Sequence, residues 1–89
     1  MPHVEFAPQL QRHVPCPPQT VDARSLRGAL DIAFAAAPGL RAYVLDDQGA
    51  VRKHVAVFIN GELLHDRVLL ERALAPGDRV YVAQALSGG

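Results

Sequence analysis

The residues with the most evident chemical potential are two glycines, Gly88 and Gly89, which follow the stretch VAQALS at the end of the sequence. Glycine has no Cβ, so a Gly-Gly segment can enter a narrow cleft and leaves its carbonyl unhindered. This pattern favours a terminal carboxylate that is the working group inside another protein's active site. Two plainer explanations stay open: chain ends tolerate small residues, or the glycines derive from cloning.

Histidine and cysteine offer a second chemistry, but their spacing argues against a metal site. The four histidines are His3, His13, His54 and His65. They form no helical i, i+4 pair and no compact zinc pattern with Cys16, so we expect solvated histidines on strand faces. Cys16 lies between prolines in an expected surface loop, and a single cysteine excludes an internal disulfide and a CxxC motif.

Composition favours one small domain and gives no argument for nucleic acid or membrane partners. The chain has 89 residues, enough for a core without disulfides or metals. Its 9 basic and 9 acidic residues cancel. No apolar run could span a bilayer, and the opening MPHVEFAPQL lacks the layout of a signal peptide, so we expect a cytoplasmic protein.

The basic residues are eight arginines and one lysine, Lys53. We expect Arg52, Lys53 and Arg79 on a solvent-exposed face, with a basic rim for an acidic partner as the alternative. No nucleophile, base and orienting group can be assembled from the chain, so an enzyme is not expected.

The elements that position the terminus begin with a predicted hairpin. Residues 3–7 alternate between apolar and polar, and residues 10–14 repeat this pattern, which is typical of two strands with one buried face. The proline-rich stretch 15–19 then excludes a helix or an inner strand.

A helix of about three turns is predicted next. One apolar stripe comprises Leu26, Ala29, Leu30, Ala33, Phe34 and Ala37. Ser25 is the expected N-cap, with Asp22 as a competitor. Pro38 and a left-handed Gly39 are expected to end the helix.

The second half of the chain reads mainly as strands. Strands are predicted over 41–45, 53–59, 62–64 and 79–86. Asn60-Gly61 is typical of a type I′ turn, and APGD (75–78) of a tight turn. Residues 65–74 are too uneven to assign beyond one or two helical turns.

A right-handed crossover through the helix allows the last strand to pair in parallel beside the first, in the middle of the sheet. We therefore predict an α+β protein with a β-grasp (ubiquitin-like) fold: a mixed four- to five-stranded sheet packed on one helix. Residues 1–85 form the domain, and residues 86–89 form a flexible tail. A ferredoxin-like fold would need a second full helix, for which 65–74 is a poor candidate.

Three segments together resemble a known family. VRKHVAVFINGE (51–62), APGDRVYV (75–82) and the terminal ALSGG are similar to the ubiquitin-like sulfur carriers, the molybdopterin synthase small-subunit and thiamine sulfur-carrier family (MoaD/ThiS). The resemblance covers most of the chain, and the loop DDQGAVRK resembles the longer branch of the family. The dense prolines at 15–18, and Ser87 where many members have alanine, depart from its pattern.

The resemblance implies a protein cosubstrate that binds no cofactor of its own. A ubiquitin-activating-type partner enzyme would use ATP to adenylate the Gly89 carboxylate, and a sulfur donor would displace AMP to leave a thiocarboxylate. A sulfur-acceptor enzyme or synthase large subunit would then receive the sulfur, in molybdopterin, cysteine, thiamine or related biosynthesis. A ubiquitin-like modifier that forms isopeptide bonds through Gly89, and an interaction module with an inert tail, are the alternatives.

The same resemblance implies where partners bind. Leu86 and Ser87 belong to the segment that an activating enzyme would grip ahead of Gly88. Phe58, Tyr81 and Leu86 are the candidates for a docking patch on the sheet face opposite the helix. The alternative is that these side chains are ordinary exposed or packed apolar residues.

Overall fold

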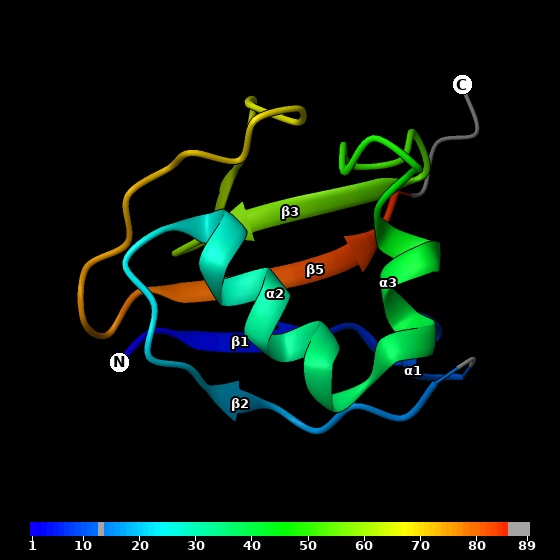
Figure 1. Ribbon diagram of the computed structural model, residues 1–89, viewed down its shortest axis with the longest axis horizontal. Helices are drawn as coiled ribbons and strands as arrows, with labels where there is room; N and C mark the ends of the chain where they lie inside the picture. Colours follow the sequence, from blue (N-terminus) through cyan, green and yellow to red (C-terminus); the bar gives the residue numbers. More distant parts are fainter. Residues whose placement is uncertain (13, 86–89) are drawn as a thin grey trace.

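The computed structural model describes residues 1–12 and 14–85. Its elements are β1 (His3–Phe6), α1 (Pro8–Gln11), β2 (Gln19–Thr20), α2 (Leu26–Ala36), α3 (Pro38–Val44), β3 (Val55–Ile59), β4 (Glu62–Leu63) and β5 (Arg79–Gln84). They form one mixed five-stranded sheet in the order β2-β1-β5-β3-β4 (Figure 1). Strand β5 pairs in parallel with β1, and the other pairs are antiparallel. The predicted parallel pairing in the middle of the sheet is confirmed.

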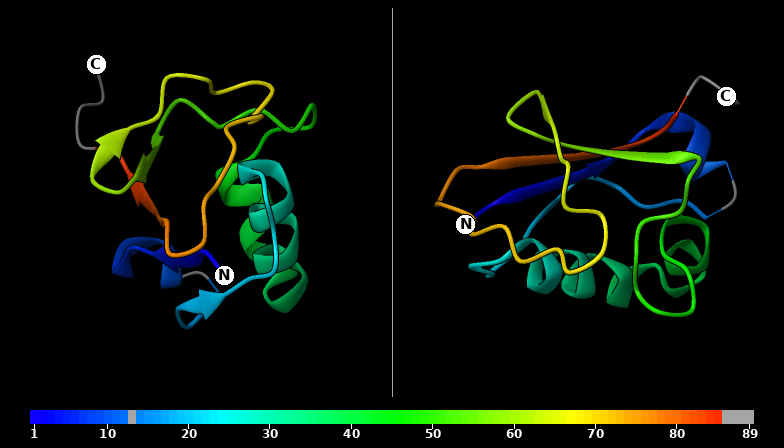
Figure 2. Two further views of the ribbon diagram at one scale, coloured as in Figure 1. Left: turned by 90° about the vertical axis from the view of Figure 1, so that its left-hand side faces the viewer. Right: turned by 90° about the horizontal axis from the view of Figure 1, so that it is seen from above.

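Helices α2 and α3 lie on one face of the sheet and leave the opposite face of the central strands open, whereas the short α1 lies outside their layer, after the end of β1 (Figure 2). Strands β1, β3 and β5 alternate between buried and more exposed residues, as a sheet covered on one side requires. Every residue of the predicted apolar stripe from Leu26 to Ala37 is buried. The core is therefore the layer between α2, α3 and the inward side chains of the three central strands.

The start of α2 is capped from two directions. Ser25 Oγ accepts a hydrogen bond from the Gly28 amide at 3.1 Å, as predicted for the N-cap. The amides of Leu26 and Arg27 donate to carbonyls of the segment that precedes β5, at 2.9 and 3.0 Å. The second of these carbonyls belongs to Leu70, which is buried and adopts a positive φ of 55°. Residues 65–74 are thus an irregular capping segment, and the predicted helical turns there are wrong.

The second strand of the opening hairpin was predicted in the wrong place. Residues Pro8–Gln11 form α1, in which proline occupies the first helical turn, where its missing N–H is not needed. The Gln11 side chain donates to the Phe6 carbonyl at 2.8 Å. The antiparallel partner of β1 is β2, which begins after the prolines.

The prediction of a strand over 41–45 is also wrong, because this segment belongs to α3. Pro38 interrupts α2 and then occupies the first turn of α3. Leu40 and Val44, four residues apart, are both buried on one side of α3. Gly39 lies inside this helix and does not adopt the predicted left-handed φ. The sheet therefore packs on α2 and α3, not on one helix.

Cys16 is buried, with 1% of its surface exposed, so the predicted surface position is wrong. Its Sγ accepts a hydrogen bond from the Gln19 side chain at 3.2 Å. Cysteine is small and weakly polar, and it behaves here as an apolar residue beneath the proline-rich loop.

Both predicted tight turns are confirmed. Asn60 and Gly61 have φ values of 53° and 84°, as a type I′ turn between β3 and β4 requires. Gly77 has a φ of 90° in the turn before β5. Within the residues that the structure describes, no helix combines the length and the apolar character needed to cross a bilayer.

We expect Leu30→Ala to lower the free energy of unfolding by about 2–5 kcal/mol, because it opens a cavity under the sheet. Leu30 is fully buried, whereas Ile32 on the same helix is 42% exposed. Urea titration of Ile32→Ala is the matched control, with an expected loss of less than about 1 kcal/mol. Equal losses in the two variants would contradict the assignment of the core.

Candidate functional site

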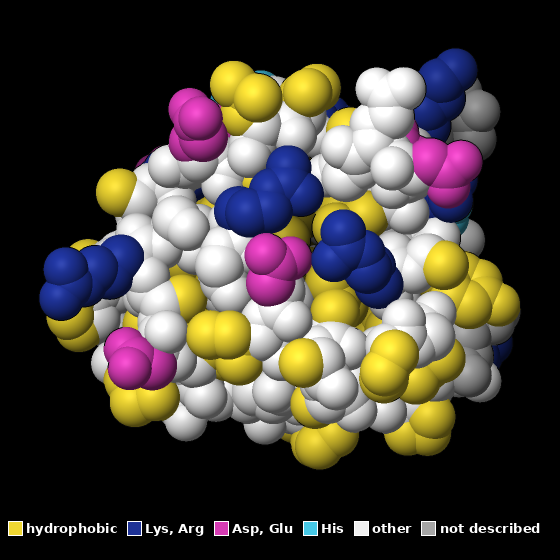
Figure 3. Space-filling view, in the orientation of Figure 1, with side chains coloured by type: hydrophobic (Ala, Val, Ile, Leu, Met, Phe, Trp, Pro, Cys, Tyr) yellow, Lys and Arg dark blue, Asp and Glu magenta, His cyan; other side chains and the backbone are white. Residues whose placement is uncertain are grey.

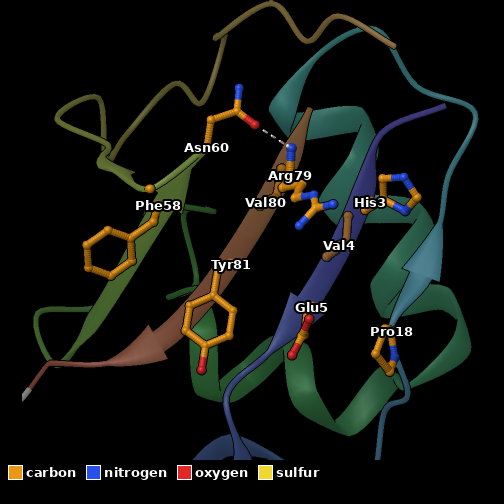
Figure 4. A pocket seen from close by; sticks show the side chains of 10 residues that line it. His3, Val4, Glu5, Pro18, Phe58, Asn60, Arg79, Val80 and Tyr81 are labelled. Atoms are coloured by element: carbon orange, nitrogen blue, oxygen red, sulfur yellow. Dashed lines mark hydrogen bonds between the residues drawn. The ribbon is translucent and has the colours of Figure 1, made fainter. Parts of the chain in front are cut away.

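The uncovered face of the sheet carries the candidate interaction surface (Figure 4). A shallow groove of about 880 Å³ lies on this face, across the central strands and beside Pro18. By contrast, basic and acidic side chains are interspersed over the side of the molecule shown in Figure 3, which the helices cover.

An apolar row crosses three strands of this face. Phe58 on β3 is directly opposite Tyr81 on β5 and Leu63 on β4. Tyr81 and Leu63 are 38% and 48% exposed. Cross-strand neighbours of this kind have Cβ atoms about 5 Å apart, so their side chains form one continuous surface. Glu5 on β1 is opposite Tyr81 and ends the row with a charge.

The polar end of the groove lies where β5 begins. His3 is opposite Arg79 in the register of β1 and β5. The Arg79 amide donates to Asn60 Oδ1 at 2.9 Å, and Asn60 Nδ2 donates to Asp78 Oδ1 at 3.0 Å (Figure 4 shows the first of these bonds). The Asn60 side chain thereby ties the β3–β4 turn to the start of β5.

The carboxyl group of Asp78 is ionised, and in this form it holds the turn that precedes β5. The hydrogen bond from Asn60 lowers the pKa of the Asp78 carboxyl below its ordinary value, and a bond from the Ala75 amide at 2.8 Å acts in the same direction.

The opposite end of β5 is where the chain leaves the sheet. Ala83 is opposite Ala56 on the open face, so small side chains follow the aromatic pair. The Ala85 amide donates to the His54 carbonyl at 2.7 Å and extends the pairing of β5 with β3 by one residue. A partner can therefore approach the backbone closely beside the exit of the chain.

The structure brings together only part of the predicted site. Phe58 and Tyr81 are paired as direct cross-strand neighbours. The other predicted site residues, Leu86, Ser87, Gly88 and Gly89, lie outside the described residues, as does His13. Among the described residues, no three side chains of histidine, cysteine, aspartate or glutamate gather into a possible metal site.

Sequence reasoning missed Leu63 and Glu5 as members of the apolar row. Leu63 could have been placed there, because a two-residue Asn-Gly loop fixes which residues of a hairpin are opposite each other. Glu5 could have been assigned to the row only if the register of β1 against β5 had been known. No turn joins these two strands directly, so the local sequence does not fix that register.

We expect acid to destabilise the native chain more than an Asp78→Ala variant. Because folding lowers the pKa of Asp78, its carboxylate stabilises the fold above the unfolded pKa of about 3.9, and this contribution disappears as the pH falls through the lower folded pKa. Urea midpoints of both proteins, compared between about pH 6 and pH 2.5, measure the difference. Asp46 and Asp66, whose pKa values are also lowered, are present in both proteins. Identical pH profiles would contradict this assignment.

Comparison with known proteins gives full-length structural matches. No protein-family model and no curated protein matches the sequence. The chain superposes on SAMP1, small archaeal modifier protein 1, from Haloferax volcanii with a TM-score of 0.80 and 27% identity, covering 99% of this chain and 98% of that chain. It also superposes on a chain of the BexX/CysO complex of Amycolatopsis orientalis (TM-score 0.81, 18% identity, 100% of both chains). Urm1 from Trypanosoma brucei matches with a TM-score of 0.70 and 21% identity, over 99% and 94% of the two chains.

Proposed function

We propose that this chain, which is a ubiquitin-like β-grasp protein of the MoaD/ThiS type, carries sulfur as a thiocarboxylate on Gly89. It is a protein substrate of enzymes and not an enzyme itself. A partner enzyme would use ATP to convert the Gly89 carboxylate to an acyl adenylate, and a sulfur donor would displace AMP. We expect this chemistry in the cytoplasm, where ATP is available.

One observation carries the proposal: the central strand of a ubiquitin-like fold ends at Gln84, only three residues before a Gly-Gly sequence. Strand β5 is held on both sides, by β1 and β3. Its pairing continues to Ala85, only four positions before Gly89. Because the strand is fixed up to Ala85, a partner that has bound the domain would have to order only the four residues that follow, which limits the loss of entropy on binding.

The open face supports docking of such a partner. Tyr81, Phe58 and Leu63 form an apolar surface on the strands that lead to the exit of the chain. Partly exposed aromatic side chains with polar surroundings are common anchors of protein interfaces. The CysO structure matched above was solved as a complex with BexX, which is a precedent for a partner protein in that system.

Mass spectrometry of the full chain, incubated with its activating enzyme, ATP and a sulfur donor, tests the proposal. We expect a mass gain equal to the exchange of one oxygen atom for sulfur, located at Gly89 by fragmentation. A Gly89→Val variant should show no exchange, because its side chain hinders the attacked carbonyl. Its melting temperature should equal that of the native chain.

Two results would contradict this proposal. The first is a native chain that never gains sulfur although the same enzyme and donor modify a known carrier. The second is a Gly89→Val chain that unfolds at a lower temperature, since Gly89 would then belong to the folded body.

We expect Tyr81→Ala to slow adenylation at low protein concentration by about tenfold or more, the effect of removing an interface anchor. The rate of pyrophosphate release from ATP measures this step. Ile32→Ala, which removes a similarly exposed apolar side chain from α2, is the matched control and should leave the rate unchanged. A smaller effect of Tyr81→Ala than of the control would place docking elsewhere.

A second candidate function is that of a protein modifier. The match to SAMP1, whose name describes a modifier protein, favours it. Here the activated Gly89 would form isopeptide bonds with lysines of other proteins. Higher-mass conjugates that disappear when Gly89 is deleted would support this role.

A further inference from the structure

The chain contains one asparagine, Asn60, and a glycine follows it directly. Both residues are exposed, in the turn between β3 and β4. Around Gly61, no heavy atom of the described residues other than its chain neighbours lies within 4 Å of the position that a Cβ would take. The amide nitrogen of a glycine has no side chain beside it. The Gly61 nitrogen can therefore act as a nucleophile toward the Asn60 side chain.

Three hydrogen bonds tie Asn60 to the start of β5. Asn60 Oδ1 accepts from the Arg79 amide at 2.9 Å, and the Asn60 amide donates to the Arg79 carbonyl at 2.8 Å (Figure 4 shows the first of these bonds). Asn60 Nδ2 donates to Asp78 Oδ1 at 3.0 Å. Because the Asp78 carboxylate is charged, this last bond is stronger than one between neutral groups. We call Asn60, Asp78 and Arg79 the Asn60 latch.

We propose that Asn60 is a site of spontaneous deamidation and that the Asn60 latch sets its rate. The Gly61 nitrogen loses its proton to solvent base and attacks Asn60 Cγ, which forms a C–N bond and a five-membered succinimide ring. The Cγ–Nδ2 bond breaks, and Nδ2 takes up a proton and leaves as ammonia. Water then opens the ring at either carbonyl and gives aspartate or isoaspartate. One water is consumed and one ammonia released, without oxidation or reduction, and no step depends on the proposed function.

The latch opposes this reaction at two atoms of the side chain. Nδ2 is the leaving atom, so its bond to Asp78 must break before ammonia departs. Oδ1 belongs to the carbonyl that is attacked, and its bond to the Arg79 amide holds the side chain against β5. Deamidation therefore requires a local opening between the β3–β4 turn and the start of β5.

The aspartate product destroys the latch. It places a carboxylate oxygen where Nδ2 donated to Asp78, so two acceptors face each other with no proton between them. Like charges at this separation repel each other. The β3–β4 turn should therefore separate from the start of β5.

The isoaspartate product also changes the hairpin. It routes the main chain through the former side-chain carbonyl and lengthens the turn by one carbon. A two-residue type I′ loop fixes which residues of β3 and β4 are opposite each other. Strand β4 has only two residues, so the pairing of Leu63 with Phe58 should be lost. This product would thus remove one member of the apolar row from the open face.

Mass spectrometry of the full chain tests the inference. The protein is kept at mildly alkaline pH, either folded in buffer or unfolded in guanidinium chloride, and sampled over several weeks. We expect the mass change of one amide replaced by an acid, located at Asn60 by fragmentation. The folded chain should convert at least about tenfold more slowly than the unfolded chain, because the latch must open first.

Two variants separate the latch from general stability. Asp78→Ala removes the partner of Nδ2 and should raise the deamidation rate of the folded chain by about tenfold, the effect of losing one charge-assisted hydrogen bond. Asp46→Ala is the matched control, since Asp46 also accepts backbone amides, those of Gln48 and Ala50, but in the loop that precedes β3. It should leave the rate unchanged. Circular dichroism checks that both variants are folded.

Hydrogen exchange reports the structural consequence. The Leu64 amide donates to the Val57 carbonyl at 2.8 Å, directly after β4, and should exchange faster in the isoaspartate product. The Ala85 amide donates to the His54 carbonyl at 2.7 Å, at the opposite end of β3, and should keep its exchange rate.

The inference is overturned if the folded native chain converts as fast as the unfolded chain, or if the chain does not convert even in guanidinium chloride. It is also overturned if Asp78→Ala converts no faster than the native chain, or if Asp46→Ala accelerates conversion equally. A slower Asp78→Ala variant would show that the carboxylate acts as a base in the reaction, which contradicts the latch. Should Asp78→Ala fail to fold, the comparison of folded and unfolded native chain still decides.

Discussion

The parallel pairing of β5 with β1 is the constraint on which the rest of the molecule depends. Because β5 is also held by β3, it is a central strand with partners on both sides. Its register sends Val80 and Val82 into the core and Tyr81 to the open face. The same pairing places the start of the chain at one end of the sheet and Ala85 at the other. The core and the open face are therefore arranged by one set of backbone hydrogen bonds.

The segments outside the sheet are held mainly by polar side chains bonded to backbone groups. The Arg27 guanidinium donates to the carbonyls of Gly49, Val68 and Leu69 at 2.8–3.2 Å and so joins two loops to α2. Arg67 donates to the Arg52 and Val55 carbonyls, which fixes the approach to β3. Asp66 accepts three backbone amides, of which that of Glu71 contributes most to the lowering of its pKa. Such bonds supply hydrogen-bond partners for backbone N–H and C=O groups that are not paired within a helix or a sheet. A segment without regular secondary structure can therefore still have a defined conformation.

Apart from the parallel pairing of β5 with β1, the features that the sequence predicts depend on neighbouring residues, and most of those that it misses depend on distant ones. The stripe of α2, its Ser25 cap and the Asn60-Gly61 turn are local patterns, and the structure has them all. Residues 41–45 have the composition of a strand, yet Leu40 and Val44 are buried together only in a helix, which tertiary packing selects. Residues 65–74 lack any period because their backbone groups pair with the side chains of Arg27 and Asp66 and with the start of α2. Of the apolar row on the open face, the sequence analysis named Phe58 and Tyr81 as candidates for docking, which stays a prediction; the position of Glu5 beside them depends on the long-range register of β1 against β5.

The burial of Cys16 bears on the chemistry proposed for the tail. An activated acyl group reacts with thiolates as well as with amines. A thiol within reach would therefore be acylated and form a thioester. Cys16 is the only cysteine, and it lies in the core with its Sγ bonded to the Gln19 side chain. Attack by this thiol would require the proline-rich loop to open, at a cost in buried apolar contacts. Under the proposed function, packing would therefore keep this thiol from reacting with an activated Gly89.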